Sequence, residues 1–230
     1  NDPTGPAITE DGAGIDLSTT SDFATSTITG NLIKDNHGRK GSGIYAAGNI
    51  TISDNQIIEN TGSYDNAQGG GIFISGEGTT ITNNIIHGNY AWIGSALWFS
   101  KPASMTENSI TGHTGNSLIY ISCDDERNQV CSNSGQKVQS TPIINNNNIV
   151  NNSTTYWVYD NHEDDSDNVD TENNWWGTVN SSEIRSKVYD WNNDATLGLV
   201  DYTPFLTAPN TQAPPSPPAN VAAHTGPTSI

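Results

Sequence analysis

Short apolar segments with an asparagine at a fixed place recur along the chain. In the first five copies an isoleucine or methionine stands three residues before the asparagine, and an isoleucine stands two residues after it. Alternation of this kind over four to eight residues is typical of a β-strand with one buried face. The copies, of which the sixth is altered, are ITGNLI (28–33), ISDNQI (52–57), ITNNII (81–86), MTENSI (105–110), INNNNI (144–149) and DTENNW (170–175).

A second family of segments precedes most of these copies. They are GAGIDL (12–17), GSGIYA (41–46), GGGIFI (69–74), GSALWF (94–99), NSLIYI (116–121) and YWVYD (156–160). Strand alternation predicts that one residue of each segment points inwards, namely Ile15, Ile44, Ile72, Leu97, Ile119 and Val158. The residues that follow then point outwards as an aromatic column of Tyr45, Phe73, Trp98, Tyr120 and Tyr159. The alternative is a register shifted by one residue, which would place these rings in the core.

Unequal loops separate the repeated units, which predicts a solenoid. The spacing varies from 22 residues (Leu97 to Ile119) to 39 residues (Asn108 to Asn147), whereas the units themselves keep their length. No unit is long enough to bury its own apolar face, and stacked coils share one continuous core. An asparagine at a turn tolerates the left-handed conformation, and its side-chain amide can bond to the next coil. We therefore expect about six coils with a ladder of Asn31, Asn55, Asn84, Asn108, Asn147 and Asn173, rather than a β-sandwich.

The run TENNWWGT (171–178) predicts the end of the solenoid. Trp175 falls in the isoleucine column of the last copy and Trp176 lies next to it, so we expect the two indoles to cover the apolar end of the core. Ser181 or Ser182 can cap a short helix, and VDYTPF (200–205) can return as an edge strand.

These units resemble the right-handed parallel β-helix repeats of the pectate-lyase-like superfamily and of secreted bacterial and archaeal β-helix proteins, over residues 12 to 206. The run NNWWGT with its downstream helix and strand resembles the closing module of such proteins. The resemblance implies an all-β parallel β-helix with a C-terminal capping helix and strand. It also makes a polysaccharide lyase or glycoside hydrolase one candidate function, although a shared fold does not establish a shared activity.

Charge narrows the partners. Eight Lys and Arg residues face 25 Asp and Glu residues, which gives a formal net charge of −17, so a nucleic acid would be repelled. No apolar run approaches the length of a membrane span. Cys123 and Cys131 lie eight residues apart in a polar insertion, which favours a local disulfide and an oxidising compartment over two free thiols. We therefore expect an extracellular or cell-surface protein.

Few residues offer catalytic chemistry. Lys34 and Asp35 follow the first coil, and Glu59 follows the second at an equivalent place, so the three could form a small acid and base site or an ordinary solvated cluster. His87 and His113 follow adjacent coils but lack a third metal ligand. The acidic run 160–172 contains Asp164, Asp165 and Asp167, which could hold calcium or form a hydrated loop. No cofactor is required by any of these patterns, and calcium is the one ion that they suggest.

The chain ends in a proline-rich segment, residues 207 to 230, which is typical of an extended linker or of a tail that docks on a surface. Its last part, PPANVAAHTGPTSI, resembles the start of a fibronectin type III domain. Two classes of function follow. The favoured one is a non-catalytic structural or adhesive module that associates with itself head to tail or contacts a polysaccharide through the aromatic column. The alternative is a carbohydrate-active lyase or hydrolase.

Overall fold

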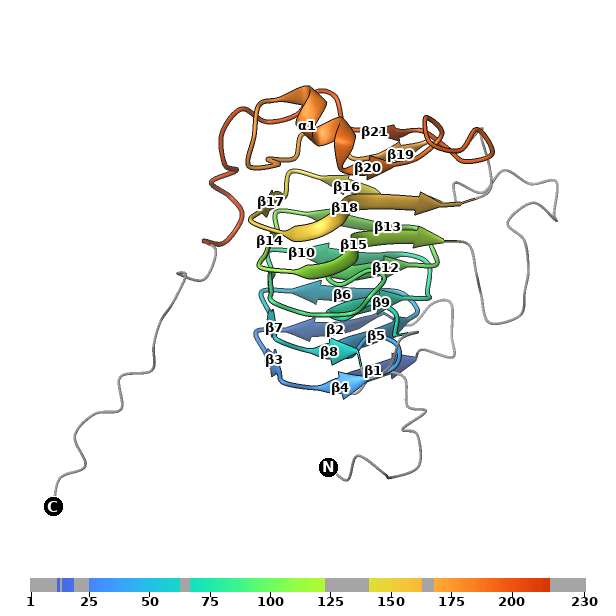
Figure 1. Ribbon diagram of the computed structural model, residues 1–230. Helices are drawn as coiled ribbons and strands as arrows, with labels where there is room; N and C mark the ends of the chain where they lie inside the picture. Colours follow the sequence, from blue (N-terminus) through green and yellow to red (C-terminus); the bar gives the residue numbers. More distant parts are fainter. Residues whose placement is uncertain are drawn as a thin grey trace, which may run out of the picture.

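The chain winds into a solenoid of stacked parallel strands, as the computed structural model shows (Figure 1). The structure describes residue 12 and residues 14–18, 25–62, 67–122, 141–162 and 168–215. Each coil contributes short strands to three sheets, and all strand pairs within these sheets are parallel. The predicted parallel β-helix is therefore confirmed, with seven strands in each of its two larger sheets.

Sheet I comprises β1 (Ile15–Ser18), β5 (Ile44–Ala47), β9 (Ile72–Ile74), β12 (Leu97–Phe99), β15 (Thr114–Ser122), β18 (Ser153–Asn161) and β20 (Val188–Tyr189). Sheet II comprises β2 (Ser26–Thr29), β6 (Ile50–Ser53), β10 (Thr79–Thr82), β13 (Ala103–Thr106), β16 (Ile143–Asn145), β19 (Val169–Asp170) and β21 (Val200–Asp201). Sheet III comprises β3 (Leu32–Lys34), β7 (Gln56–Ile58), β11 (Ile85–His87), β14 (Ser109–Thr111) and β17 (Asn148–Val150). A small fourth pair consists of β4 (His37–Gly38) and β8 (Thr61–Gly62).

One apolar core runs along the axis between the three sheets. The strand register places similar apolar side chains above one another in successive coils. Ile28 pairs with Ile52, and Ile52 and Met105 each pair with Ile81. The inward column of sheet I is also confirmed, and from the second coil onwards its members are fully buried: Ile44, Ile72, Leu97, Ile119 and Val158. Each strand is too short to be stable alone, so burial shared between coils holds the fold together.

A buried ladder of asparagine side chains precedes sheet III. In each step the backbone N–H and the side-chain amide of one asparagine both donate to Oδ1 of the asparagine in the next coil, at 2.8 to 3.1 Å. The prediction of the sixth member was wrong, since Asn147 donates to Asn174 and not to Asn173. We call Asn31, Asn55, Asn84, Asn108, Asn147 and Asn174 the first ladder.

The left-handed conformation belongs to the residue before each ladder asparagine, not to the asparagine itself as we expected. Asp54, Asn83 and Glu107 have φ values of 57°, 56° and 58°, and Gly30 precedes Asn31 with a φ of 69°. This residue turns the chain outwards, so that the following amide points into the core. The division of roles explains why the preceding position accepts Gly, Asn, Asp or Glu whereas the ladder position keeps asparagine.

The one-residue error in the last copy has a local cause. Ile143 pairs with Asp170, so the next residue, Thr171, takes the place of the isoleucine that precedes the ladder in other coils. Thr171 is fully buried and its hydroxyl donates to Asp201 O at 2.9 Å. Trp176, rather than Trp175, therefore enters the core. Its ring stacks on that of Trp157, with 5.8 Å between the ring centroids and 7° between the ring planes.

A compact cap covers the C-terminal end of the solenoid (Figure 1). The helix α1 (Ser181–Ser186) is capped by Asn180, whose side chain accepts from the N–H groups of Ser182 and Glu183, so neither predicted serine is the N-cap. Ile184 of α1 is buried in the core. The expected return strand is present as β21 at the edge of sheet II. Nowhere in the described ranges is a helix long and apolar enough to cross a membrane.

Candidate functional site

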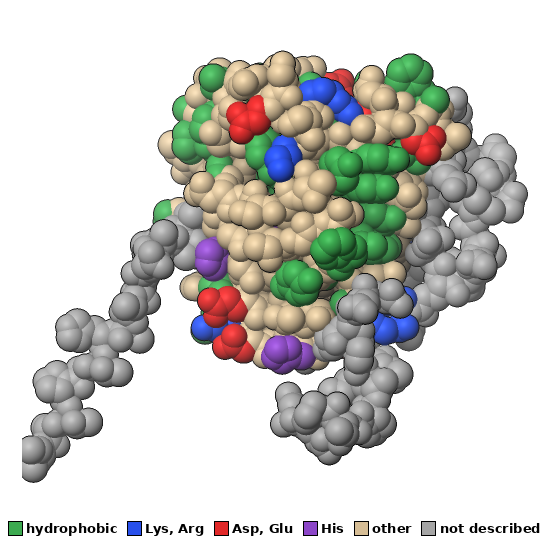
Figure 2. Space-filling view, in the orientation of Figure 1, with side chains coloured by type: hydrophobic (Ala, Val, Ile, Leu, Met, Phe, Trp, Pro, Cys, Tyr) green, Lys and Arg blue, Asp and Glu red, His purple; other side chains and the backbone are tan. Residues whose placement is uncertain are grey.

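The aromatic column lies on the outer face of sheet I, as predicted. Figure 2 shows hydrophobic side chains gathered in a stripe to the right of centre, over the strands of this sheet. The register pairs Tyr45 with Phe73, Phe73 with Trp98, Trp98 with Tyr120, and Tyr120 with Tyr159. Tyr189 of β20 adds a sixth ring, which sequence alternation did not include. The column therefore spans six coils without a gap.

Within the column the rings stack on one another. Tyr45 and Phe73 are 5.5 Å apart with planes at 10°, and Tyr159 and Tyr189 are 4.3 Å apart at 6°. Trp98 and Tyr120 are the one tilted pair, at 44°. Burial raises the pKa of Tyr159, with a further contribution from Tyr189. Each ring covers the faces of its neighbours, and Phe73 and Trp98 are buried whereas the tyrosines are half-buried. The column therefore has little free face for a sugar to stack on.

The predicted acid and base residues do come together. Lys34 Nζ lies 2.9 Å from Glu59 Oε2 and 3.7 Å from Asp35 Oδ2, and all three side chains are exposed. The hydrogen bond to Glu59, and then the charge of Asp35, raise the pKa of Lys34. A lysine that acts as a general base needs a lowered pKa, so this cluster holds its lysine in the wrong protonation state for proton abstraction.

His113 is a structural residue in a second ladder, which follows sheet III. Asn36 and Asn60 repeat the pattern of the first ladder, because the amide of each donates to Oδ1 of the asparagine in the next coil. His113 takes the next place after Asn89, where its Nε2 lies 3.1 Å from Ile86 O and its N–H donates to Asn152 Oδ1. We call Asn36, Asn60, Asn89, His113 and Asn152 the second ladder. Burial lowers the pKa of His113 to about 4.

The candidate metal and disulfide residues lie outside the described residues. These are Asp164, Asp165 and Asp167, and the two cysteines Cys123 and Cys131. Within the ranges that the structure describes, no three His, Cys, Asp or Glu side chains come together as metal ligands. The calcium site and the disulfide remain predictions.

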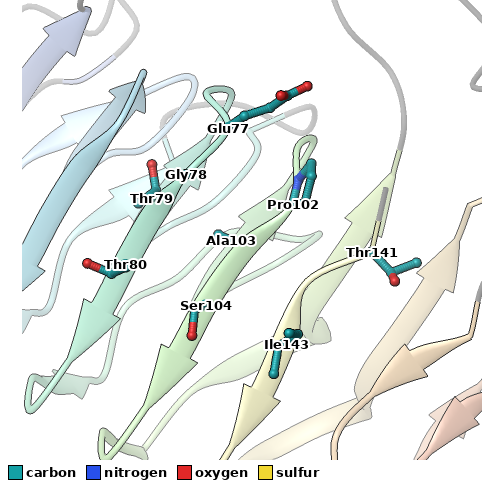
Figure 3. A pocket seen from close by; sticks show the side chains of 9 residues that line it. All are labelled: Glu77, Gly78, Thr79, Thr80, Pro102, Ala103, Ser104, Thr141 and Ile143. Carbon is teal, nitrogen blue, oxygen red and sulfur yellow. The ribbon is translucent and has the colours of Figure 1, made fainter. Parts of the chain in front are cut away.

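A shallow hollow of about 340 Å³ lies on the outer face of sheet II (Figure 3). Thr80, Ser104 and Ile143 follow one another on β10, β13 and β16, and the register pairs them in a line. Glu77 stands at the upper rim and points away from the strands. The lining is mostly hydroxyl and aliphatic, which can hold a ligand by contact but supplies no catalytic pair.

The start of the proline-rich tail docks on sheet III of the same chain. The side-chain amide of Asn148 forms two hydrogen bonds with the backbone of Asn210. Its Nδ2 donates to Asn210 O at 3.0 Å, and its Oδ1 accepts from the N–H of Asn210 at 2.8 Å. Ser109 donates to Pro214 O, and Ala213 is buried. Trp175 lines the hollow beneath this segment. The tail thus rests on β14 and β17, away from the aromatic column.

The last coils contain two buried carboxylates that the sequence analysis did not single out. Asp160 lies in the inward column of sheet I, where the preceding coils have Ile121 and Phe99. Its Oδ1 accepts from the N–H of His162 at 3.0 Å, and the backbone of Gly198 also bonds to the carboxylate, but no described cation faces it. Burial, and then the charge of Asp190, raise the pKa of Asp160 to about 7. Strand alternation from Val158 would have placed this aspartate inside.

Asp190, also fully buried, has the partner that Asp160 lacks. Arg185 bonds to both of its carboxylate oxygens at 2.9 Å, and the N–H groups of Val200 and Asn192 donate to them as well. Arg185 also donates to Val188 O and to Asn193 Oδ1. This network fastens α1 to the turn after β20, so we assign it to the cap and not to catalysis.

Comparison with known proteins bears on the fold. A family model described as "Right handed beta helix region" matches residues 13–186, about three quarters of the chain. No curated protein and no solved structure matches it. The family match agrees with the three stacked parallel sheets and assigns the hand of the solenoid. The chain therefore belongs to the right-handed β-helix family.

Proposed function

We propose that the chain is a non-catalytic structural or adhesive module of an extracellular protein. The observation that supports this best is the aromatic column on the outer face of the solenoid, whose rings follow one another through six coils and stack in every pair except Trp98 and Tyr120, which are tilted. Such a column stiffens the rod, and its half-buried tyrosines offer ring edges to a partner that lies alongside it, whereas Phe73 and Trp98 are buried.

The acid and base cluster supports the same proposal. Lys34, Asp35 and Glu59 are exposed and compensate one another's charges, and the pKa of Lys34 is raised. A lyase or hydrolase would need a carboxylate or lysine whose environment pushes its pKa towards the working pH, next to a substrate groove. Among the described residues the one carboxylate with such a pKa is Asp160, which is fully buried and out of reach of a polysaccharide.

Self-association would use the N-terminal end of the rod. The strands β1, β2 and β3 each have a described neighbour on one side only, whereas the opposite end carries α1 and the cap (Figure 1). An edge that carries no other strand favours addition of one. We therefore propose pairing through these edges over head-to-tail stacking, for which the cap would have to move. The extracellular location stays a prediction that rests on the cysteine spacing and the acidic composition.

A panel of neutral and acidic polysaccharides tests the proposal directly. The purified chain is incubated with each polymer, with and without added calcium, and the solution is assayed for new reducing ends and for unsaturated products. We expect no product on any polymer. Release of products that is abolished in Lys34→Ala or Glu59→Gln would overturn the proposal and establish the carbohydrate-active alternative.

A further inference from the structure

Two exposed rings lie outside the aromatic column. Tyr90 and Trp92 lie in the segment after β11, where they are 39% and 54% exposed. Neither contacts another ring within the described residues. Their exposed fractions leave part of each ring accessible, and no other described ring covers them, in contrast to the rings of the column, which cover each other.

The backbone holds this pair in place on both sides. Tyr90 forms β-bridges with Thr61 in the preceding coil and Thr114 in the next. Its N–H donates to Asn60 O at 2.8 Å, and its carbonyl accepts from Gly62 at 2.7 Å. Trp92 O accepts from the N–H of Asn116 at 2.9 Å. The backbone that carries the two rings is thus held in place, so binding of a ligand costs little backbone entropy.

Hydroxyl side chains lie on both sides of Tyr90 along the solenoid axis. The bridges and the pairing of β15 with β18 place Thr61, Tyr90, Thr114 and Ser153 in one outward line over four successive coils, about 4.8 Å apart. None of the hydroxyls of Thr61, Thr114 and Ser153 forms a hydrogen bond with another described residue. We call these four residues together with Trp92 the Tyr90 face. It combines open aromatic faces with uncommitted donors and acceptors, and none of its members is charged.

Open ring faces beside free hydroxyls match the chemistry of a neutral sugar. A pyranose ring offers an apolar face of C–H groups for an aromatic ring and a rim of hydroxyls for hydrogen bonds. The net charge of −17 disfavours anionic glycans, which the whole chain would repel. An extended peptide would need unpaired backbone N–H and C=O groups, but those of Tyr90 are already bonded to the neighbouring coils. The line of four coils suits a linear chain better than a single sugar.

We propose that the Tyr90 face binds a neutral polysaccharide chain that runs along the solenoid axis. Tyr90 stacks on one sugar ring of this chain, Trp92, two residues further on in the same coil, contacts the chain from the side, and Thr61, Thr114 and Ser153 bond to the sugar hydroxyls. This inference rests on the proposed adhesive function and gives it a ligand class and a site.

Tryptophan fluorescence and calorimetry can test the site. The probes are cellohexaose, xylohexaose, mannohexaose and chitohexaose, with hexagalacturonate as the anionic comparison. We expect saturable binding of at least one neutral probe, and an affinity about tenfold weaker in each of Trp92→Ala and Tyr90→Ala. The matched control is Trp191→Ala, which removes an indole of similar exposure, 48%, from the cap. It should leave the affinity unchanged, and circular dichroism checks that every variant is folded.

Three outcomes would overturn the inference: no binding of any neutral probe, equal binding by both ring variants and the wild type, or stronger binding of hexagalacturonate. A Trp98→Ala variant that loses affinity while Trp92→Ala keeps it would move the site to the aromatic column. Failure here is separate from failure of the proposed function. Cleavage of a probe would disprove the non-catalytic proposal even if binding maps to the Tyr90 face, whereas absence of binding leaves a structural module intact.

Discussion

The two ladders flank sheet III, one before its strands and one after them, yet only the first consists of asparagine throughout. In the first ladder every inner asparagine donates twice to the coil above and accepts twice from the coil below. In the second ladder, Nε2 of His113 lies near Ile86 O and its backbone N–H donates to Asn152 Oδ1. Its side chain has no oxygen that could accept a hydrogen bond from Asn89. The His113 ring can therefore replace the asparagine amide as a donor to a backbone carbonyl, but not as an acceptor from the preceding coil.

Each coil supplies a side-chain donor at this position, and the second ladder shows that the side-chain acceptor can be absent. Both ring nitrogens of His113 lie near backbone carbonyls, Asn89 O at 3.0 Å and Ile86 O at 3.1 Å, although a neutral imidazole carries one N–H. Burial nevertheless keeps the ring neutral. The second ladder therefore contains a residue that responds to pH, whereas the first does not titrate at all.

Replacing a central member of the first ladder should have the largest effect. Asn108→Leu removes the donors to Ile81 O, Thr106 O and Asn147, and the acceptor of two bonds from Asn84. The partners stay buried and unsatisfied, so we expect the free energy of unfolding to fall by about 5 kcal/mol. Urea denaturation measures it.

Asn31→Leu is the matched control, because Asn31 is the exposed end of the same ladder. It donates to Asn55 but accepts from no described coil below, so we expect a loss of less than about 1 kcal/mol. Equal losses in the two variants would show that the ladder does not act through buried, unsatisfied groups.

The buried carboxylate of Asp160 should make the protein less stable as the pH rises. Its pKa is about 7 in the folded chain against 3.8 ordinarily, so the folded state binds the extra proton between these values. The contribution is complete below pH 3.8 and is lost as the pH rises through 7, a change of about 4 kcal/mol. Asp160→Asn should remove this slope and be more stable than the wild type at pH 8. An unchanged slope in the variant would contradict the assignment.

His113 should act in the opposite direction. Its pKa is about 4 in the folded chain against 6.5 ordinarily, so the unfolded state binds the extra proton between these values. The contribution of His113 to the free energy of unfolding is fully present above pH 6.5. It falls by about 3 kcal/mol as the pH drops from 7 to 4. His113→Asn restores the ladder residue and should abolish the fall.

The opposite pH dependences that Asp160 and His113 give to the free energy of unfolding nearly cancel in the wild type between pH 4 and 7. Each single variant removes one of them and so reveals the other. Denaturation midpoints of both variants and of the double variant, measured at each pH, separate the two groups. If His113→Asn and the wild type keep parallel pH profiles, His113 does not carry the second ladder's pH response.

Sequence alternation predicted the columns of this fold because every coil repeats them. Ile44 and Ile72, or Tyr45 and Phe73, keep their places since a shift by one residue would turn each apolar side chain outwards. The pattern failed to predict the register of the last copy (170–175), because Thr171 is a buried polar residue at the place of an isoleucine in the other coils. A hydroxyl that bonds to β21, a strand 30 residues away, leaves no local signal.

The site residues were less predictable for a similar reason. Gly112 before His113 copies Gly88 before Asn89, which is a signal that could have placed the histidine in the second ladder. Whether a ring such as Trp98 stacks on its neighbours or Trp92 stands free depends on side-chain packing between coils, which periodicity does not encode.

Releasing the docked tail should have a moderate effect. Asn210→Ala keeps the chain length but removes the donor to Asn146 O at 2.5 Å and the acceptor for the N–H of Gln212. These bonds hold the turn of the tail that lets Asn148 reach its backbone. We expect a loss of about 1 kcal/mol in unfolding free energy and faster hydrogen exchange at residues 207–215. Exchange that stays slow in this segment would show that the proline-rich stretch is held by other contacts.

The surface ion pair between the first two coils should have the smallest effect, although it joins the same coils as the start of both ladders. Lys34 and Glu59 bond at 2.9 Å, but both side chains are exposed to water, which screens their attraction. Lys34→Ala should therefore leave the melting temperature within the error of measurement, at low and at high salt alike. Calorimetry of Lys34→Ala beside Asn55→Ala makes the comparison within one pair of coils, because Asn55 links to Asn31 at the same level. A larger loss for the lysine variant would mean that charge at the surface, rather than the buried amides, holds neighbouring coils together.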